Sequence, residues 1–300
     1  NPVSGVWNDT PPEPLRRQLG VKAWYLRDRN WSPDFPTSAQ DMMRVYLREK
    51  TLPSPMGPND WLSGVIAFEP QFFEELLRFV GPLTVEGKTF TADNFFDQLQ
   101  YDSEIGFLQK GIPVERRKDI VLKIGEQLTQ RLMSQPASRW GDLLDLMTQS
   151  LDQKHVLFYI NDPTTLRLLD QRNWTGRAHG SDGDYLWVVD ANLAALKTDG
   201  VMDKQIRYSV DAASGTATVT LTYKNNTKAI DWRHTRYRDY ARIYVPEGSE
   251  LISSEGAMAG DVTQTGGRAT PGAVDIMHEL GKTVFGAFWS IEPGRTGTLR

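Results

Sequence analysis

The periodicity of the apolar residues changes at about residue 201, and this change constrains the fold more than any other feature of the chain. Before it, apolar runs such as 61–68 and 154–160 alternate with stretches whose apolar residues recur three and four positions apart, as in 70–80. After it, the runs 204–211 and 216–223 alternate between apolar and polar residues around a turn. The first pattern indicates an α/β layer architecture, and the second indicates an antiparallel β-sandwich-like domain.

We therefore predict two domains. Residues 1–200 form an α/β domain, a mixed sheet with flanking helices, and residues 201–300 form the β-rich domain. The run 61–68 is apolar at successive positions, which predicts a strand buried on both faces, as in a parallel sheet. Because the chain begins and ends abruptly, we expect the first domain to be incomplete at its N-terminal end and the second at its C-terminal end.

Composition excludes several classes of protein. The absence of cysteine excludes a disulfide scaffold and a thiolate metal site, and the four scattered histidines show no metal-ligand spacing. The net charge of −4 gives no electrostatic reason to expect nucleic acid as a partner. No run of about twenty apolar residues is present, so no segment of this sequence is predicted to span a bilayer.

The stretch 24–39, WYLRDRNWSPDFPTSA, indicates a polar site. The run 21–26 predicts a buried strand, which leads into the charged cluster 27–30. Two prolines then prevent regular structure, and Ser38 is the expected N-cap of a helix over 39–50. A strand that delivers charges into a rigid loop before a helix is a common way to build a site. An ordinary connection with solvated charges explains the same spacing equally well.

A second candidate site lies at the start of a long helix predicted over 114–133. Its first turn carries Arg116, Arg117 and Lys118, although helix N-termini favour anions by typically 0.3–1 kcal/mol per charge. A bound anion would reverse the sign of this effect, because the cations and the free N–H groups would then act together. Alternatively, Glu115 and Asp119 neutralise the cations on a solvated face.

The stretch Trp24–Pro36 resembles the hallmark of the bacterial family called domain of unknown function 4012. Members of this family are typically anchored in the cell envelope, with most of the chain outside the membrane. The resemblance extends along nearly the whole sequence through five supporting stretches: Ser63–Ala67, Val80–Val85, Lys154–Leu157, Val188–Asn192 and Ile243–Ser249.

That family in turn is distantly similar to the LytR-CpsA-Psr phosphotransferases, which move a glycopolymer from a polyprenyl pyrophosphate carrier to the cell wall with the help of Mg²⁺. The relatives' opening strand, with its own Asp and Arg, has no clear counterpart after Asn1. The resemblance implies phosphate binding by Arg27, Arg116 and Arg117 and, at most, magnesium binding by Asp28. The neighbouring Arg29 and Lys118 are further candidate phosphate ligands, and in an enzyme the catalytic candidates Asp28 and Asp34 would bind magnesium or orient the acceptor hydroxyl.

Two functions follow from these residues. In the first, a phosphotransferase uses Mg²⁺ and convergent arginines to stabilise the charge on a transferring group. In the second, a non-catalytic module uses the same basic pocket to bind a polyprenyl-linked glycan or another anionic envelope polymer. A full set of acidic ligands facing the arginines would favour the enzyme, whereas Asp28 held in a salt bridge with Arg27 would favour the module. Both functions predict that Arg27, Arg116 and Arg117 converge.

The expected location is extracellular, in the cell envelope. We expect the chain to be tethered to the membrane through a segment outside this sequence. Other envelope proteins are further expected partners, and nucleic acid is not.

Overall fold

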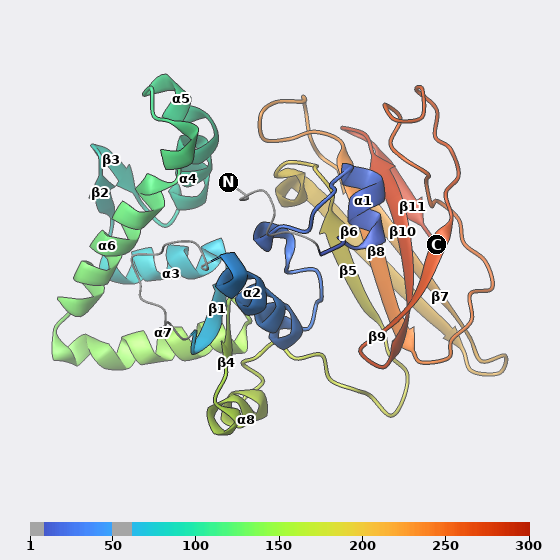
Figure 1. The fold of residues 1–300 in the computed structure, drawn as a ribbon, viewed down its shortest axis with the longest axis horizontal. Coiled ribbons are helices and arrows are strands. Elements are labelled where there is room, and N and C mark those ends of the chain that lie inside the picture. Colours follow the sequence, from blue (N-terminus) through green and yellow to red (C-terminus); the bar gives the residue numbers. More distant parts are fainter. Residues whose placement is uncertain (1–8, 50–61) are drawn as a thin grey trace. The chain divides into compact units, whose positions relative to one another are not determined.

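The computed structural model describes residues 9–49 and 62–300, and the chain divides into two compact units. The helical unit is Asp34–Arg177, and the sandwich unit combines Asn1–Pro33 with Ala178–Arg300 (Figure 1). The predicted α/β class with a later sheet-rich region is confirmed. The division differs from the predicted boundary at residue 200 because strand β5 (Trp187–Asn192) is hydrogen-bonded to β8 (Tyr237–Pro246) and so belongs with the later strands.

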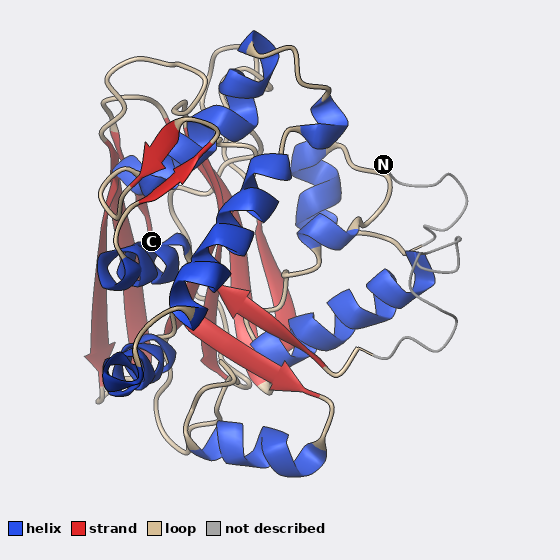
Figure 2. Cartoon of the chain, turned by 90° about the vertical axis from the view of Figure 1, so that its left-hand side faces the viewer, coloured by secondary structure: helices blue, strands red, loops and turns tan. Residues whose placement is uncertain are grey.

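The helical unit contains two short antiparallel sheets among helices (Figure 2). Strand β1 pairs with β4, and β2 pairs with β3. Its elements in chain order are α2 Phe35–Glu49, β1 Gly64–Phe68, α3 Pro70–Val80, β2 Leu83–Val85, β3 Lys88–Phe90, α4 Phe95–Tyr101, the π-helical turn η2 Asp102–Gly106, α5 Phe107–Gln109, the 3₁₀ turn η3 Val114–Arg116, α6 Asp119–Met133, the 3₁₀ turn η4 Ala137–Arg139, α7 Trp140–Asp152, β4 Val156–Ile160 and α8 Pro163–Gln171.

The core of the helical unit follows from helical periodicity. The helix indicated by the apolar spacing over 70–80 is confirmed as α3, and Gly81, a residue type that commonly ends helices, is its C-cap. Apolar residues three and four apart on α3 and α6 pack together with β2 and β3 into one buried cluster: Phe72, Leu76, Leu77, Val80, Leu83, Val85, Phe90, Ile120, Ile124 and Leu128.

The prediction of a buried parallel strand over 61–68 is wrong. Strand β1 is antiparallel to β4, and Ile66 and Phe68 are 57% and 52% exposed. The ring of Phe68 packs edge-on against Phe73 at a centroid distance of 4.9 Å, so α3 covers part of it. An apolar run therefore marks a strand here without marking burial on both faces.

The sandwich unit has two antiparallel sheets, with strand orders β5-β8-β10-β9 and β11-β7-β6, and the predicted antiparallel β-rich region is confirmed. The β-hairpin predicted from 204–223 is present as β6 and β7. The elements in chain order are α1 Glu13–Leu19, the 3₁₀ turn η1 Leu26–Asp28, β5 Trp187–Asn192, the 3₁₀ turn η5 Thr198–Val201, β6 Met202–Asp211, β7 Thr216–Asn225, β8 Tyr237–Pro246, β9 Val274–Glu279, β10 Lys282–Ile291 and β11 Thr296–Leu299.

Alternate residues of β8 face opposite sides of their sheet. Ala241 lies in the cluster between the two sheets, whereas Tyr240 lies in a second cluster with Leu15, Trp24 and Trp31 of the N-terminal segment. Gly286 of β10 leaves room for the Tyr240 ring, because a Cβ at this position would lie 2.1 Å from the Tyr240 hydroxyl. The predicted strand over 21–26 is therefore wrong: Val21 and Trp24 pack in the cluster on the outer face of a sheet, and residues 21–26 do not join its ladder.

Candidate functional site

Arg27 and Asp28 lie in η1 of the sandwich unit and form an ion pair. The Arg27 Nε atom is 3.5 Å from an Asp28 carboxylate oxygen, and the Arg27 side chain is 70% exposed. Its guanidinium carbon also lies 4.7 Å from the centroid of the Tyr25 ring. Arg27 is thus accessible to a ligand, while Asp28 already has a cation beside it.

Arg29 is enclosed by the protein. Only 1% of the residue is exposed, and its Nη2 donates to Asp9 Oδ2 and to the Trp24 carbonyl, both at 2.8 Å. The guanidinium carbon lies 4.1 Å from the centroid of a Trp24 ring. These contacts hold the segment between Asp9 and Arg29 together, so the structure gives Arg29 a structural role and does not expose it to a phosphate.

Asp34 caps helix α2. Its Oδ2 accepts hydrogen bonds from the Thr37 N–H at 2.9 Å and the Thr37 hydroxyl at 2.6 Å, and the residue is 4% exposed. The helix therefore begins at Phe35, and the prediction of Ser38 as the N-cap is wrong. The carboxylate proposed as a catalytic group is committed to a helix terminus.

The long helix predicted over 114–133 is interrupted near its start. Residues Val114–Arg116 form the separate turn η3, and the α-helix begins only at Asp119, with Lys118 at the N-cap position. The three cations thus precede the helix, and the dipole argument for a bound anion loses its basis. Arg116 Nε instead pairs with Asp119 Oδ2 at 2.8 Å, as the neutralisation alternative predicted.

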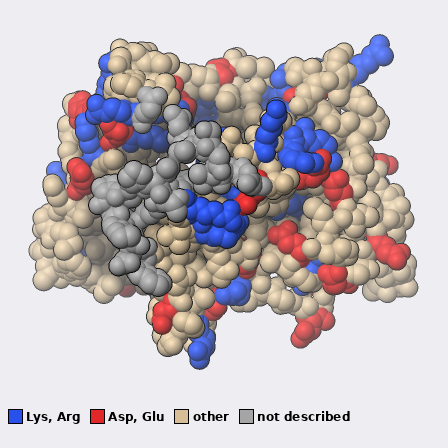
Figure 3. All heavy atoms as spheres, in the orientation of Figure 1, with Lys and Arg blue, Asp and Glu red and all other residues tan. Residues whose placement is uncertain are grey.

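A pocket of about 240 Å³ nevertheless brings Arg116 and Arg117 together in the helical unit. It is lined by the turn between β2 and β3, by η2 and α5, and by the segment that enters α6. Basic and acidic side chains are interspersed over this part of the surface, at the upper left of Figure 3. The charged lining residues are Glu86, Asp102, Lys110, Arg116, Arg117, Asp119 and Lys123.

Glu86 is the shared partner of two lysines in this pocket. Its carboxylate oxygens accept from Lys123 Nζ at 2.6 Å and from Lys110 Nζ at 3.1 Å. The hydrogen bond from Lys123, followed by that from Lys110, holds the pKa of Glu86 below its usual value. Two ammonium groups from different elements therefore converge on the position of one anionic group.

Asp102 forms the buried wall of the pocket. It is 4% exposed, pairs with Lys88 Nζ and accepts from Gln98 Nε2 at 3.1 Å. It opens the π-helical turn η2, and a Cβ on Gly106 would lie 2.7 Å from its Oδ1. Turns of this kind are frequent at functional sites. Here the turn fixes a carboxylate that is committed to Lys88.

Of the predicted phosphate ligands, Arg116 and Arg117 line this pocket, and Lys118 adjoins them in the sequence. Arg27, Asp28 and Arg29 belong to the sandwich unit, so the convergence of Arg27 with Arg116 and Arg117 stays a prediction.

Sequence reasoning missed Lys110 and Lys123. Lys123 had a detectable signal, because Arg116, Asp119, Ile120 and Lys123 are spaced as one helical face.

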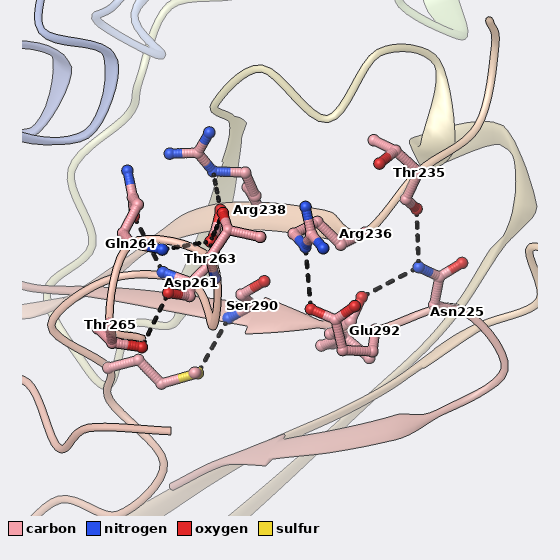
Figure 4. Close-up of polar contacts among 12 residues, drawn as sticks. Asn225, Thr235, Arg236, Arg238, Asp261, Thr263, Gln264, Thr265, Ser290 and Glu292 are labelled. Atoms are coloured by element: carbon pink, nitrogen blue, oxygen red, sulfur yellow. Dashed lines mark hydrogen bonds and ion pairs between the residues drawn. The ribbon is translucent and has the colours of Figure 1, made fainter. Parts of the chain in front are cut away.

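The basic and aromatic composition of another segment, Trp232–Arg238, predicts an ordinary solvated loop, with a loop that meets a glycan or another protein as the alternative. Two of its arginines, Arg236 and Arg238, are ion-paired within the sandwich unit (Figure 4). Arg236 Nε lies 2.9 Å from Glu292 Oε1, and Arg238 Nε lies 3.2 Å from Asp261 Oδ2. Asp261 is itself 1% exposed, so the Arg238 pair is structural.

Within residues 9–49 and 62–300, no three histidine or acidic side chains are grouped so that they could hold a metal ion. Asp28 thus belongs to no such group in the described part of the chain. The same residues include no helix that is long and apolar enough to cross a membrane.

Comparison with known proteins identifies one family. Residues 3–103 match the family described as "Protein of unknown function (DUF4012)", a range that contains the Trp24–Pro36 stretch and ends within η2. No curated protein and no solved structure matches the chain. Residues 3–103 thus match the DUF4012 family, as the sequence resemblance predicted.

Proposed function

We propose that the chain is a non-catalytic binding module of the cell envelope, which holds the pyrophosphate of a polyprenyl-linked glycan or a similar anionic polymer in the pocket of the helical unit. The module would act outside the cell, tethered to the membrane by a segment outside this sequence and in contact with other envelope proteins. One observation carries the proposal: Lys110, Arg116, Arg117 and Lys123 line a single pocket of about 240 Å³.

The chemistry of this lining suits a polyvalent anion. Guanidinium groups grip phosphate oxygens in pairs, and ammonium groups add point charges. The carboxylates that now pair with the arginines are accessible, since the side chains of Glu104 and Asp119 are 42% and 38% exposed. Exposed ion pairs typically contribute only about 0–1 kcal/mol, so a pyrophosphate can replace these carboxylates at little cost.

The same geometry favours binding over catalysis. Phosphoryl transfer needs acidic ligands for Mg²⁺ that face the phosphate-binding arginines. Asp28 is paired with Arg27, Asp34 caps a helix and Asp102 is paired with Lys88. The acidic residues predicted to bind magnesium or to act in catalysis, and the buried carboxylate of the pocket, are thus already engaged.

The test is calorimetric titration with a soluble short-chain polyprenyl pyrophosphate analogue. We expect Arg117→Ala and Lys110→Ala each to weaken binding about tenfold, since a hydrogen bond to a charged group contributes roughly 1.5–3 kcal/mol. Arg131→Ala is the matched control, because Arg131 lies in the last turn of α6 and does not line the pocket. Equal affinity in all of these proteins would refute the proposed pocket.

Two further arms sharpen this test. Affinity should fall as the salt concentration rises, because the pocket is open to solvent. Arg27→Ala should weaken binding only if Arg27 converges with the pocket as the sequence predicted. Transfer of the glycosyl phosphate to an acceptor in the presence of Mg²⁺ would instead support the phosphotransferase.

A further inference from the structure

A cleft of about 550 Å³ lies between the two sheets of the sandwich unit. Both of its walls are inner faces of the sandwich. One sheet contributes Tyr208, Val210 and Val219, and the other contributes Ile243 and Phe285. The cleft is therefore an opening in the apolar interior of the domain rather than a groove on its outer surface.

The end of the sandwich that contains the cleft is less well packed than the part farther along the same strands. On the inner face of β7, Leu221 is the next residue after Val219, and on the inner face of β8, Ala241 is the one before Ile243. Leu221 and Ala241 are both fully buried. The pairing register of β6 and β7 places Val210 on the same face of the sheet as Leu221. Val210 is nevertheless 55% exposed, because it lies at the cleft. Protein interiors are normally close-packed, so an apolar opening of this size has the character of a ligand site.

The rim of the cleft adds further apolar surface. Residues 249–254 follow the end of β8, and Glu255 then pairs with Arg300 through two backbone hydrogen bonds of 2.8 and 2.9 Å. Within this segment Leu251 and Ile252 line the cleft and are 37% and 78% exposed. Three exposed apolar side chains, counting Val210, thus gather around one opening.

The polar groups of the cleft do not favour a peptide. The wall formed by β8 and β10 consists of central strands whose backbone groups are already used in the ladders, so a peptide backbone lying against this wall would find few partners. Tyr208 donates its hydroxyl to the Asp184 carboxylate at 2.7 Å, and burial with this partner raises the pKa of Tyr208 to about 12. A hydrocarbon chain requires no hydrogen-bond partner.

We propose that this cleft binds the acyl chain of a lipid. If a methylene group occupies roughly the 30 Å³ of a liquid water molecule, the cleft accommodates on the order of eighteen such groups, which matches one acyl chain. A polyprenyl carrier chain is several times too long for it. The inference is independent of the proposed pyrophosphate site, which lies in the other unit.

The test is binding of palmitate and laurate by calorimetry, below their micellar concentrations. Palmitate should bind at least tenfold more tightly than laurate, since each buried methylene contributes up to about fourfold. Val210→Asn and Ala217→Trp should each weaken palmitate binding at least tenfold, the first by polarity and the second by filling the cleft. Ile206→Asn is the matched control, because Ile206 lies on the same face of β6 and is 49% exposed but does not line the cleft.

Equal palmitate affinity in the wild type and both cleft variants would overturn the proposal. So would tighter binding of farnesyl pyrophosphate than of palmitate, or an equal loss of palmitate binding in Ile206→Asn. Each variant is also titrated with the pyrophosphate analogue used for the helical unit. Unchanged analogue affinity with lost palmitate binding separates the two sites, and the opposite pattern would refute the acyl site alone.

Discussion

Each unit contains a cluster of lysines and carboxylates, and the two clusters differ in the ratio of ammonium groups to acceptors. In the sandwich unit, Lys204 Nζ donates to Asp190 at 2.8 Å, to the Tyr237 hydroxyl at 2.9 Å and to Asp199 at 3.1 Å. These three acceptors match the three donors of an ammonium group. In the helical unit, Lys110 and Lys123 both bind one carboxylate, that of Glu86.

The difference shows which cluster suits a structural role and which suits a ligand. Asp190 is only 17% exposed at its side chain and also accepts from Tyr223, so the Lys204 network links several strands in a partly buried setting. The Lys123 side chain is 50% exposed, and its ion pair is open to competition. A satisfied network stabilises the fold, whereas an exposed one can exchange its anion.

The largest expected effect comes from removing the charge of Asp190. Asp190→Asn should lower the free energy of unfolding by roughly 2–3 kcal/mol, because it leaves Lys204 and Tyr223 with a poorer partner in a partly buried site. Glu86→Gln should lower it by at most about 1 kcal/mol, as for an exposed ion pair. Urea denaturation measures both. Equal losses would show that the two clusters do not differ.

Because of Asp239, we expect the stability of the sandwich unit to depend on pH. Asp239 is fully buried, its Oδ2 accepts from Trp289 Nε1 at 2.8 Å, and burial together with the Asp190 charge raises its pKa well above the ordinary 3.8. The folded state therefore holds this proton more tightly than the unfolded state does. Stability is greatest below the ordinary pKa and is lost as the pH rises through the folded-state pKa, by about 1.4 kcal/mol per pH unit at most.

Asp239→Asn should remove this slope while keeping an acceptor for Trp289. The measurement is the free energy of unfolding in a series of buffers from the ordinary pKa upward, for the wild type and the variant. Parallel curves for the two proteins would show that Asp239 does not hold a proton in the folded state.

A smaller effect is expected at the pocket wall. Gly106→Ala should cost about 1–2 kcal/mol, since the added Cβ would lie 2.7 Å from the Asp102 carboxylate and displace it from Lys88. Gly125→Ala in α6 is the control: its Cβ would contact nothing within 4 Å, and alanine favours helix. Thermal unfolding compares the two. A control variant as unstable as Gly106→Ala would contradict the steric explanation.

Local periodicity predicted much of the fold. Helix α3, with its proline start and glycine end, and the β6–β7 hairpin could be read directly, because their signals are confined to neighbouring residues. The strand prediction for 21–26 failed, because an apolar, aromatic segment that covers the face of a sheet has the same composition as a strand within the sheet. The sequence also predicts a short strand at 250–253 between turn residues, but no strand is present there, and this segment borders the cleft instead.

The candidate site could be predicted only in part. Arg116 and Arg117 were found through their charge, but Lys110 and Glu86 reach the pocket from separate elements, and tertiary packing decides such convergence. The break between the 3₁₀ turn at 114–116 and the helix that begins at Asp119 also escaped prediction, because a 3₁₀ turn and a helix start share the same short-range signals. Charge patterns thus locate candidates, and packing selects among them.

Chemical-shift mapping with inorganic pyrophosphate tests the proposed pocket most directly. With backbone amides of the whole chain assigned, we expect saturable shifts at Glu86, Lys110, Arg117 and Lys123 and their neighbours, and their loss in Arg117→Ala. Shifts confined to the turn that carries Arg27, or no saturable shifts in the helical unit, would contradict the account.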